Sequence, residues 1–199
     1  IDGGFPDWVE LHNVGDAPAG LGGYQLRDLK GETITLAAET ILEANRYLVI
    51  PIISTETVGF GLDRDGDTVA LHDAGGMMID EITFGRQIEN HTLGRLPTNT
   101  NQWGLCIPSP GMSNTRATVA SASGVRFNEW YAASGGAFPD DFVELASAAP
   151  WPVTLSGVTL SDDPVYNPDK FRFPAHTYLG TDDFLVLKPA QLGFGFDAW

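Results

Sequence analysis

The chain has 199 residues, of which 43% are hydrophobic, enough to build a core rather than a disordered tail. Its formal net charge of −15, with no basic patch, argues against nucleic acid as a partner. The single cysteine, Cys106, excludes an intramolecular disulfide and a cysteine-rich metal site. No apolar stretch reaches the roughly 20 residues of a membrane-spanning helix, so membrane insertion is not expected.

The apolar residues follow the period of β-strands from one end of the chain to the other. Residues 47–50, 68–72, 78–84 and 125–131 are short apolar or alternating runs bounded by glycine, proline, asparagine or aspartate. Residues 73–76 (Asp-Ala-Gly-Gly) predict a hairpin turn, because glycine accepts the positive φ that such turns need. No segment keeps a helical stripe for three turns. The pattern therefore predicts an all-β protein with antiparallel sandwich architecture.

A long internal repeat divides the sequence into two copies. The first aligned pair is identical at 8 of 21 positions without a gap, at an offset of 134 residues. A three-residue insertion raises the offset to 137 in the second pair. The aligned segments are 8–28 with 142–162, 34–50 with 171–187, and 59–61 with 193–195. A period this long exceeds that of solenoid repeats, about 20–50 residues, and so predicts two whole domains.

The predicted domains are residues 1–114 and 125–199, joined by a small-residue linker over 115–124. The first copy lacks the opening strand that 125–131 supplies to the second. The second copy stops at Trp199, whereas the first continues past the aligned region for some fifty residues. We therefore expect the chain to be part of a longer protein. We also expect unpaired strand edges to permit self-association.

The ordered motifs resemble the lamin tail domain family, particularly its bacterial secreted and surface members. The resemblance covers nearly the whole chain, and part of the order of motifs occurs twice. The motifs are Asn128-Glu129, Trp8-Val9-Glu10-Leu11-His12-Asn13, Leu21–Asp28, Tyr47–Ile50, Gly66-Asp67, Gly94–Pro97, Trp103 and Pro108–Asn114. The second copy adds Ser161–Pro164 with Phe171–Pro174. One departure, Ala146-Ser147 in place of Tyr/His-Asn, predicts a different turn after that strand.

This resemblance implies two tandem immunoglobulin-like β-sandwiches. It implies no catalytic residues, no cofactor and no metal, because the family serves for contacts with other macromolecules or as an accessory domain. The expected function is a non-catalytic attachment or interaction module of a larger bacterial protein, at the cell surface or outside the cell. The expected partner is a protein or a cell-surface polymer. Two alternatives stay open: a carbohydrate-binding module, and an accessory domain of a secreted hydrolase or kinase.

Three groups of side chains offer other chemistry. Asp63, Asp65 and Asp67 are candidate calcium ligands, but glycine comes at the fourth position and no glutamate follows at the twelfth, so a hairpin turn is favoured. A glycosidase-type pair drawn from Glu10, Glu144 and Glu129 is less favoured, because Glu10 and Glu144 occupy the same position of the repeat. The aromatic residues are expected to pack mainly in the core, and Trp151, between two prolines, is the one candidate among them for exposure and ligand contact.

Overall fold

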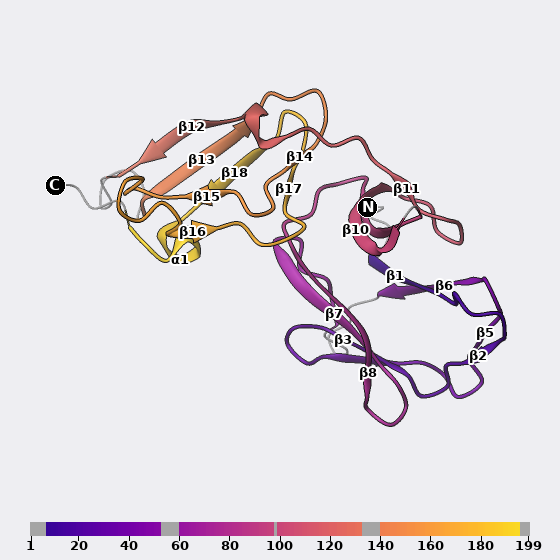
Figure 1. Cartoon of the computed structure of the whole chain (residues 1–199). Helices are drawn as coiled ribbons and strands as arrows, with labels where there is room; N and C mark the ends of the chain where they lie inside the picture. The colour runs from indigo at the N-terminus through magenta and orange to yellow at the C-terminus, as the bar shows by residue number, and fades with distance from the viewer. Residues whose placement is uncertain (1–6, 53–59, 98, 133–139, 196–199) are drawn as a thin grey trace, which may run out of the picture.

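The computed structural model describes residues 7–52, 60–97, 99–132 and 140–195, which form two β-rich units side by side (Figure 1). Within these residues the helical segments are the 3-10 turn η1 (Ala122–Gly124) and the short helix α1 (Pro189–Leu192). The all-β class predicted from the sequence is thus confirmed. No helix found in the described ranges has the length and apolar character needed to cross a membrane.

The first unit spans residues 7–117 and combines a four-stranded sheet, a three-stranded sheet and two two-stranded ladders. The four-stranded sheet has the order β4-β3-β7-β8, and the three-stranded sheet has the order β11-β10-β9. The strands are β1 (Asp7–His12), β2 (Ala19–Gly20), β3 (Gln25–Arg27), β4 (Thr33–Thr35), β5 (Ile41–Leu42), β6 (Tyr47–Ile52), β7 (Gly66–His72), β8 (Met78–Gly85), β9 (Thr92–Leu96), β10 (Asn99–Ile107) and β11 (Thr115–Arg116).

The β7–β8 hairpin has the turn that the sequence predicts. The Asp73 carboxylate accepts hydrogen bonds from the backbone N–H groups of Gly75 (2.9 Å) and Met77 (2.8 Å). Gly76 has φ +87°, a conformation that glycine adopts without strain. The hairpin carries Val69 and Phe84 into the core of the unit, where they pack with Leu26 and Phe60.

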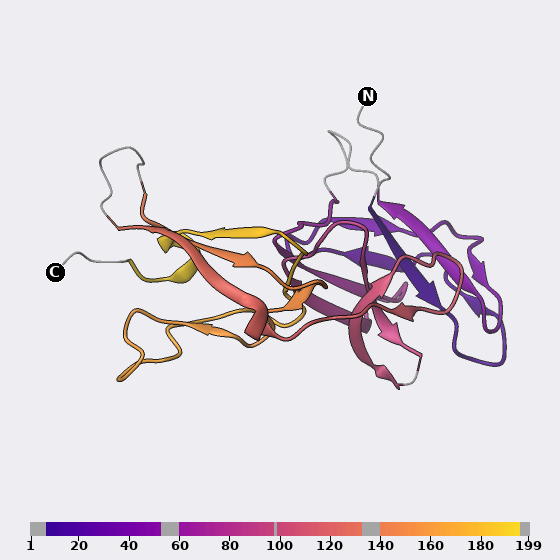
Figure 2. The ribbon, with the colours of Figure 1, turned by 90° about the horizontal axis from the view of Figure 1, so that it is seen from above.

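The second unit spans residues 120–195 and has two layers (Figure 2). One layer is the three-stranded sheet β12-β13-β18, and the other contains the two-stranded ladders β14-β17 and β15-β16. The strands are β12 (Val125–Tyr131), β13 (Phe142–Ser147), β14 (Val153–Thr154), β15 (Thr159–Leu160), β16 (Phe171–Arg172), β17 (Tyr178–Leu179) and β18 (Phe184–Leu187). Leu155, Leu179 and Val153 lie at the centre of its core with no exposed surface.

Three strand ladders of the two units have the same register at the offsets of the sequence repeat. The ladder β1-β6 corresponds to β13-β18, β2-β5 to β14-β17, and β3-β4 to β15-β16. The matched pairs are Val9↔Ile50 with Val143↔Leu187, Ala19↔Leu42 with Val153↔Leu179, and Gln25↔Thr35 with Thr159↔Arg172. In each matched pair, the first residue of the second unit comes 134 positions after its equivalent in the first unit, and its strand partner comes 137 positions after. The sequence repeat therefore reflects a repeated arrangement of strands.

The turns follow the same repeat, with one difference. Gly23 and Gly157 both have left-handed φ values, +78° and +74°. After β1 the Asn13 side chain donates hydrogen bonds to the carbonyls of Ala17 (2.8 Å) and Leu42 (2.9 Å). At the matching position, Ser147 at the end of β13 accepts a hydrogen bond from the Ala149 N–H, as the Asn13 side chain accepts one from Gly15 N. Ser147 has no amide group to donate to the two carbonyls, so the turn at Ala146-Ser147 differs in those bonds and keeps the other.

The two units contact each other through residues 85–88 of the first and 174–178 of the second. Backbone hydrogen bonds join Gly85 N to the Ala175 carbonyl (3.0 Å) and Tyr178 N to the Arg86 carbonyl (2.9 Å). The Arg86 guanidinium also donates to the Asp183 carboxylate at 3.1 Å. A small apolar cluster closes the contact, and its buried members are Ile88, Leu105, Ala117 and Tyr178. Both backbone and side chains therefore fix the junction.

The segment predicted as a linker, 115–124, contributes to both units. Its first residues form β11, which pairs with the end of β10. Further on, Ala120 N donates to the Pro152 carbonyl at 2.8 Å, and Ala120 forms a parallel bridge with Val153. Small side chains allow this close approach, because they leave the backbone accessible to neighbouring strands.

Asp183 makes the junction sensitive to pH. Burial raises the pKa of its carboxyl, but hydrogen bonds from Gly180 N and Phe184 N, with the Arg86 charge, outweigh burial and hold the pKa below its usual value. A depressed pKa contributes stability above the unfolded value, roughly pH 4, and loses it as pH falls through the folded value. We expect Asp183→Asn to lower the unfolding midpoint at pH 7, and to lower it by progressively less as the pH falls below about 4. Thermal unfolding across this range would reveal the trend, and a pH-independent difference would contradict it.

Candidate interaction surface

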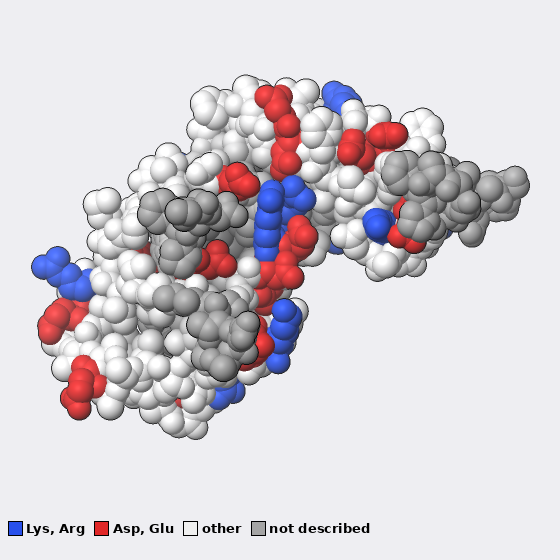
Figure 3. Space-filling model, turned by 180° about the vertical axis from the view of Figure 1, so that it is seen from behind, with Lys and Arg blue, Asp and Glu red and all other residues white. Residues whose placement is uncertain are grey.

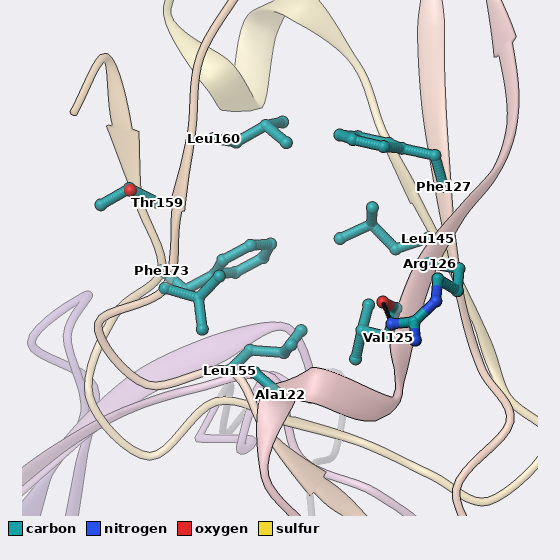
Figure 4. A pocket seen from close by; sticks show the side chains of 10 residues that line it. Ala122, Val125, Arg126, Phe127, Leu145, Leu155, Thr159, Leu160 and Phe173 are labelled. Carbon is teal, nitrogen blue, oxygen red and sulfur yellow. Dashed lines mark hydrogen bonds between the residues drawn. The ribbon is translucent and has the colours of Figure 1, made fainter. Parts of the chain in front are cut away.

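An open apolar cavity of about 230 Å³ lies between the two layers of the second unit (Figure 4). Val125, Phe127 and Leu145 line it from the β12-β13 layer, and Leu160 and Phe173 line it from the other. Phe127 and Leu160 point toward one another across the gap in Figure 4. We call this cavity the groove. Its lining is mostly apolar, with Arg126 and Thr159 as the polar members, which favours a ligand that brings apolar side chains.

Two aromatic side chains of β12 remain exposed although they stand on the core side of their sheet. Phe127 is opposite Leu145 and Trp130 is opposite Val143, and both of these partners are buried. Residues directly opposed in an antiparallel ladder place their side chains on the same face. Phe127 is nevertheless 62% exposed and Trp130 71% exposed. The part of the chain that the structure describes therefore leaves this inner face uncovered at Phe127 and Trp130.

A register shift explains why both aromatics face the same way. Simple alternation places residues three apart on opposite faces of a strand. The β12-β13 ladder is irregular between Phe127 and Glu129, and such a bulge adds one residue to one strand. Phe127 and Trp130 thereby come to the same face. No local sequence signal marks the bulge.

The surface charge agrees with the composition. Acidic side chains are spread over both units in Figure 3, and basic side chains near the middle of this face are flanked by acidic ones. Near the groove, the Arg126 guanidinium donates to the carbonyls of Ser123 (2.5 Å) and Val125 (2.7 Å). These bonds hold the Arg126 guanidinium beside the backbone at the start of its own strand. The rest of the groove lining carries no charged side chain.

The aspartates over 63–67 form a turn, as favoured from the sequence, but it is not the predicted hairpin, because among the described strands β6 pairs with β1 and β7 pairs with β3 and β8. The buried Asp67 carboxylate accepts hydrogen bonds from the N–H groups of Thr68 (2.7 Å), Asp63 (3.0 Å) and Leu29 (3.2 Å). Asp63 in turn accepts one from Asp65 N at 2.9 Å. Among the described residues no group of three or more histidine, cysteine, aspartate or glutamate side chains is placed to hold a metal ion.

We expect Asp67→Ala to lower the free energy of unfolding by about 2–3 kcal/mol, because buried N–H groups lose a charged acceptor. Asp65→Ala is the matched control, since the Asp65 side chain is 70% exposed and its ion pair with Arg86 is 3.8 Å long. We expect the control to stay within about 0.5 kcal/mol of the parent. Denaturant unfolding measures both variants, with and without calcium. A large effect of Asp65→Ala, or strong stabilisation by calcium, would contradict the turn.

Two of the three glutamates of the glycosidase-type alternative accept hydrogen bonds from separate partners. The Glu10 carboxylate accepts a hydrogen bond from Gly111 N at 2.5 Å, whereas Glu144 accepts one from the Asn128 side chain at 2.5 Å. Val143 and Leu145 are buried on either side of Glu144, so the alternation predicted for this strand is confirmed. Glu129 lies opposite Glu144 in the β12-β13 ladder.

The remaining candidates differ in accessibility. Trp151 is 53% exposed, which agrees with its place as the candidate exposed aromatic, and its contact with a ligand stays a prediction. The core packing favoured for the other aromatics is wrong for Trp130 and Phe127, which are more exposed than Trp151. Cys106 is fully buried, and burial raises the pKa of its thiol above the usual value. A buried thiol with a raised pKa is a poor nucleophile. Trp199 lies outside the described residues.

Comparison with known proteins supports the family assignment for the first unit. Residues 2–86 match the family model described as Lamin Tail Domain, a range that includes β1 to β8. The searches of curated proteins and of solved structures returned no significant match. The antiparallel strands of the matched region agree with the immunoglobulin-like sandwich that the family implies. Residues 2–86 of this chain are therefore similar to the lamin tail domain family.

Proposed function

We propose that the chain is a non-catalytic interaction module of a bacterial protein at the cell surface or outside the cell. In this proposal the second unit is a further lamin tail sandwich, as the matched strand registers suggest. The groove with exposed Phe127 and Trp130 carries the proposal. Large apolar side chains of this kind mark binding surfaces more often than catalytic ones. The expected partner is a protein or a cell-surface polymer.

Binding of fluorescently labelled chain to intact bacterial cells tests this function. We expect the double variant Phe127→Ser/Trp130→Ser to lose most of the binding. The matched control is Phe184→Ser, which changes an aromatic residue on the same sheet that is 52% exposed. Phe184 lies opposite Ala146 in the β13-β18 ladder. Its side chain is therefore on the other face of the sheet from the buried Val143 and Leu145. Equal binding by all three chains, or reproducible turnover of substrates on a hydrolase panel, would contradict the proposal.

A carbohydrate-binding role is the second candidate, and the exposure of Trp151 favours it. Aromatic rings on protein surfaces combine an apolar face with a polar edge, which suits contact with sugar rings. A glycan array tests this role directly. We expect Trp151→Ala to remove any specific glycan signal, and the Phe127→Ser/Trp130→Ser variant to retain it. A signal that survives Trp151→Ala would place the glycan elsewhere.

A further inference from the structure

The strand β8 lies at an edge of the four-stranded sheet of the first unit. It pairs with β7 on one side, and within the described residues no strand pairs with its other side. The chain continues from β8 through β9, β10 and β11, but these three strands pair with one another in a separate sheet. Outward backbone N–H and C=O groups on an edge strand can pair with a strand of another molecule. The β8 edge is therefore a pairing site unless something protects it.

One hydrogen bond shows which backbone groups of β8 point outward. Gly85 N donates to the Ala175 carbonyl of the second unit at 3.0 Å, so the Gly85 amide points away from β7. In an antiparallel strand, the N–H and C=O groups of alternate residues point to the same side. The amides of Thr83 and Glu81 therefore also point outward. The 2.8 Å bond between the Thr68 and Thr83 hydroxyls agrees, because opposed side chains are closest where no backbone bonds are exchanged.

The Asp80 carboxylate occupies one of these outward amides. It accepts a hydrogen bond from Glu81 N at 2.9 Å. One guanidinium nitrogen of Arg95 donates to both oxygens of the same carboxylate, at 2.6 and 2.7 Å. The Arg95 guanidinium in turn lies 4.7 Å from the centre of the Trp103 ring. Residues of β9 and β10 thus hold the carboxylate in place, and a strand that approached β8 would have to displace it from the Glu81 amide.

The sequence of β8 explains why such protection matters. The hairpin tip and the start of β8 expose three large apolar side chains in a row, Met77, Met78 and Ile79. Apolar, strand-forming runs with little charge are prone to pair between molecules. Asp80 and Glu81 are the charges that interrupt this run. The β7-β8 ladder is also irregular beside them, and bulges of this kind disturb the pairing of an edge.

We infer that Asp80, positioned by Arg95, blocks the pairing of β8 with β8 of a second copy of this chain. Two identical edges can pair in antiparallel fashion about a twofold axis. An axis at Ile82 places Glu81 of each copy opposite Thr83 of the other, which avoids the like-charge pair that an axis at Glu81 would create. Loss of the Asp80 carboxylate frees the Glu81 amide and removes a charge that pairing would desolvate. This role of Asp80 is independent of the proposed function.

Sedimentation of the 199-residue chain tests this role. We expect Asp80→Ala to dimerise at least tenfold more tightly than the parent chain, because the Glu81 amide becomes available to another strand. Asp169→Ala is the matched control, since it also removes an aspartate paired with an arginine, 3.0 Å from Arg172, but in the second unit. This control should sediment as the parent does. In NMR spectra of mixed labelled and unlabelled Asp80→Ala chains, intermolecular contacts should join Glu81 with Thr83.

A second substitution separates strand pairing from a general loss of stability. Glu81→Pro removes the outward N–H, and because this group points away from β7 the sheet loses no ladder bond. The double variant Asp80→Ala/Glu81→Pro should therefore sediment as the parent chain does. Dimers that persist in the double variant would show association through another surface and would overturn the inference.

The parent chain provides a test that needs no variant. The NMR shift of the Glu81 amide should follow the titration of the Asp80 carboxyl, as read from the side-chain carbonyl carbon of Asp80. An amide shift that does not follow this titration would show that Asp80 does not hold the amide in solution. Equal association of Asp80→Ala and the parent, or an equal increase in Asp169→Ala, would also contradict a blocking role for Asp80.

Discussion

Replacing Phe60 by alanine should lower the free energy of unfolding of the first unit by about 3–5 kcal/mol. The Phe60 side chain has 0% exposed surface and packs in the cluster that contains Leu26, Val69 and Phe84. Truncation removes the favourable burial of the ring and leaves a cavity that neighbours from several strands fill only in part. The cluster has members from β3, β5, β6 and the β7–β8 hairpin, so the loss of the ring is expected to affect several strands.

Denaturant unfolding followed by tryptophan fluorescence measures the effect of Phe60→Ala. Phe184→Ala is the matched control, because that ring is 52% exposed on the second unit. We expect the control to change the free energy of unfolding by about 0.5 kcal/mol or less. A loss below about 1 kcal/mol for Phe60→Ala would show that the first unit has no tightly packed centre around this ring.

Replacing Gly85 by alanine should separate the two units without unfolding either of them. A Cβ at Gly85 would lie 2.0 Å from the Thr177 hydroxyl oxygen and 3.3 Å from Pro174 Cβ. Thr177 is buried and its hydroxyl donates to the Pro174 carbonyl at 2.7 Å, so it has little freedom to move away. Overpacking of this kind costs about 1–3 kcal/mol. The overpacking therefore destabilises the contact between the two units, and not the hydrophobic core of either unit.

Hydrogen exchange and small-angle scattering together test Gly85→Ala. We expect faster exchange over 174–178 and a larger radius of gyration, while the cores keep their protection. Gly20→Ala is the matched control, because a Cβ there meets no atom within 4 Å. An unchanged radius with unchanged exchange would mean that the junction adapts to the methyl group. Loss of protection throughout the first unit would mean that the units do not fold independently of the junction.

Local patterns in the sequence predict most of the strands, because alternation and turn residues act over a few positions. The hairpin around Asp73 and the turn around Asp67 are examples, since each depends on side chains within five residues of the bends. The repeat predicts more, because identical spacing of apolar residues in two copies requires similar strand registers. The ladders β1-β6 and β13-β18 match for that reason.

Features that depend on distant contacts are not predictable in this way. Arg86 and Asp183 are 97 residues apart, and nothing local to either marks them as a pair across the junction. The segment 115–124 has the composition of a linker, yet Ala117 and Ala120 take part in packing and pairing because they are small. The inward direction of both Phe127 and Trp130 depends on a bulge that alternation alone would not predict.

Interstrand nuclear Overhauser effects would test the repeated architecture most directly, because they report strand register in solution. The structure predicts contacts between Val143 and Leu187 and between Leu145 and Leu185 in the second unit. The first unit should show the equivalent contacts Val9 with Ile50 and Leu11 with Leu48. Observation of both sets would confirm that the two units have the same strand arrangement. A register shifted by even one residue in the second unit, or the absence of these contacts there, would contradict it.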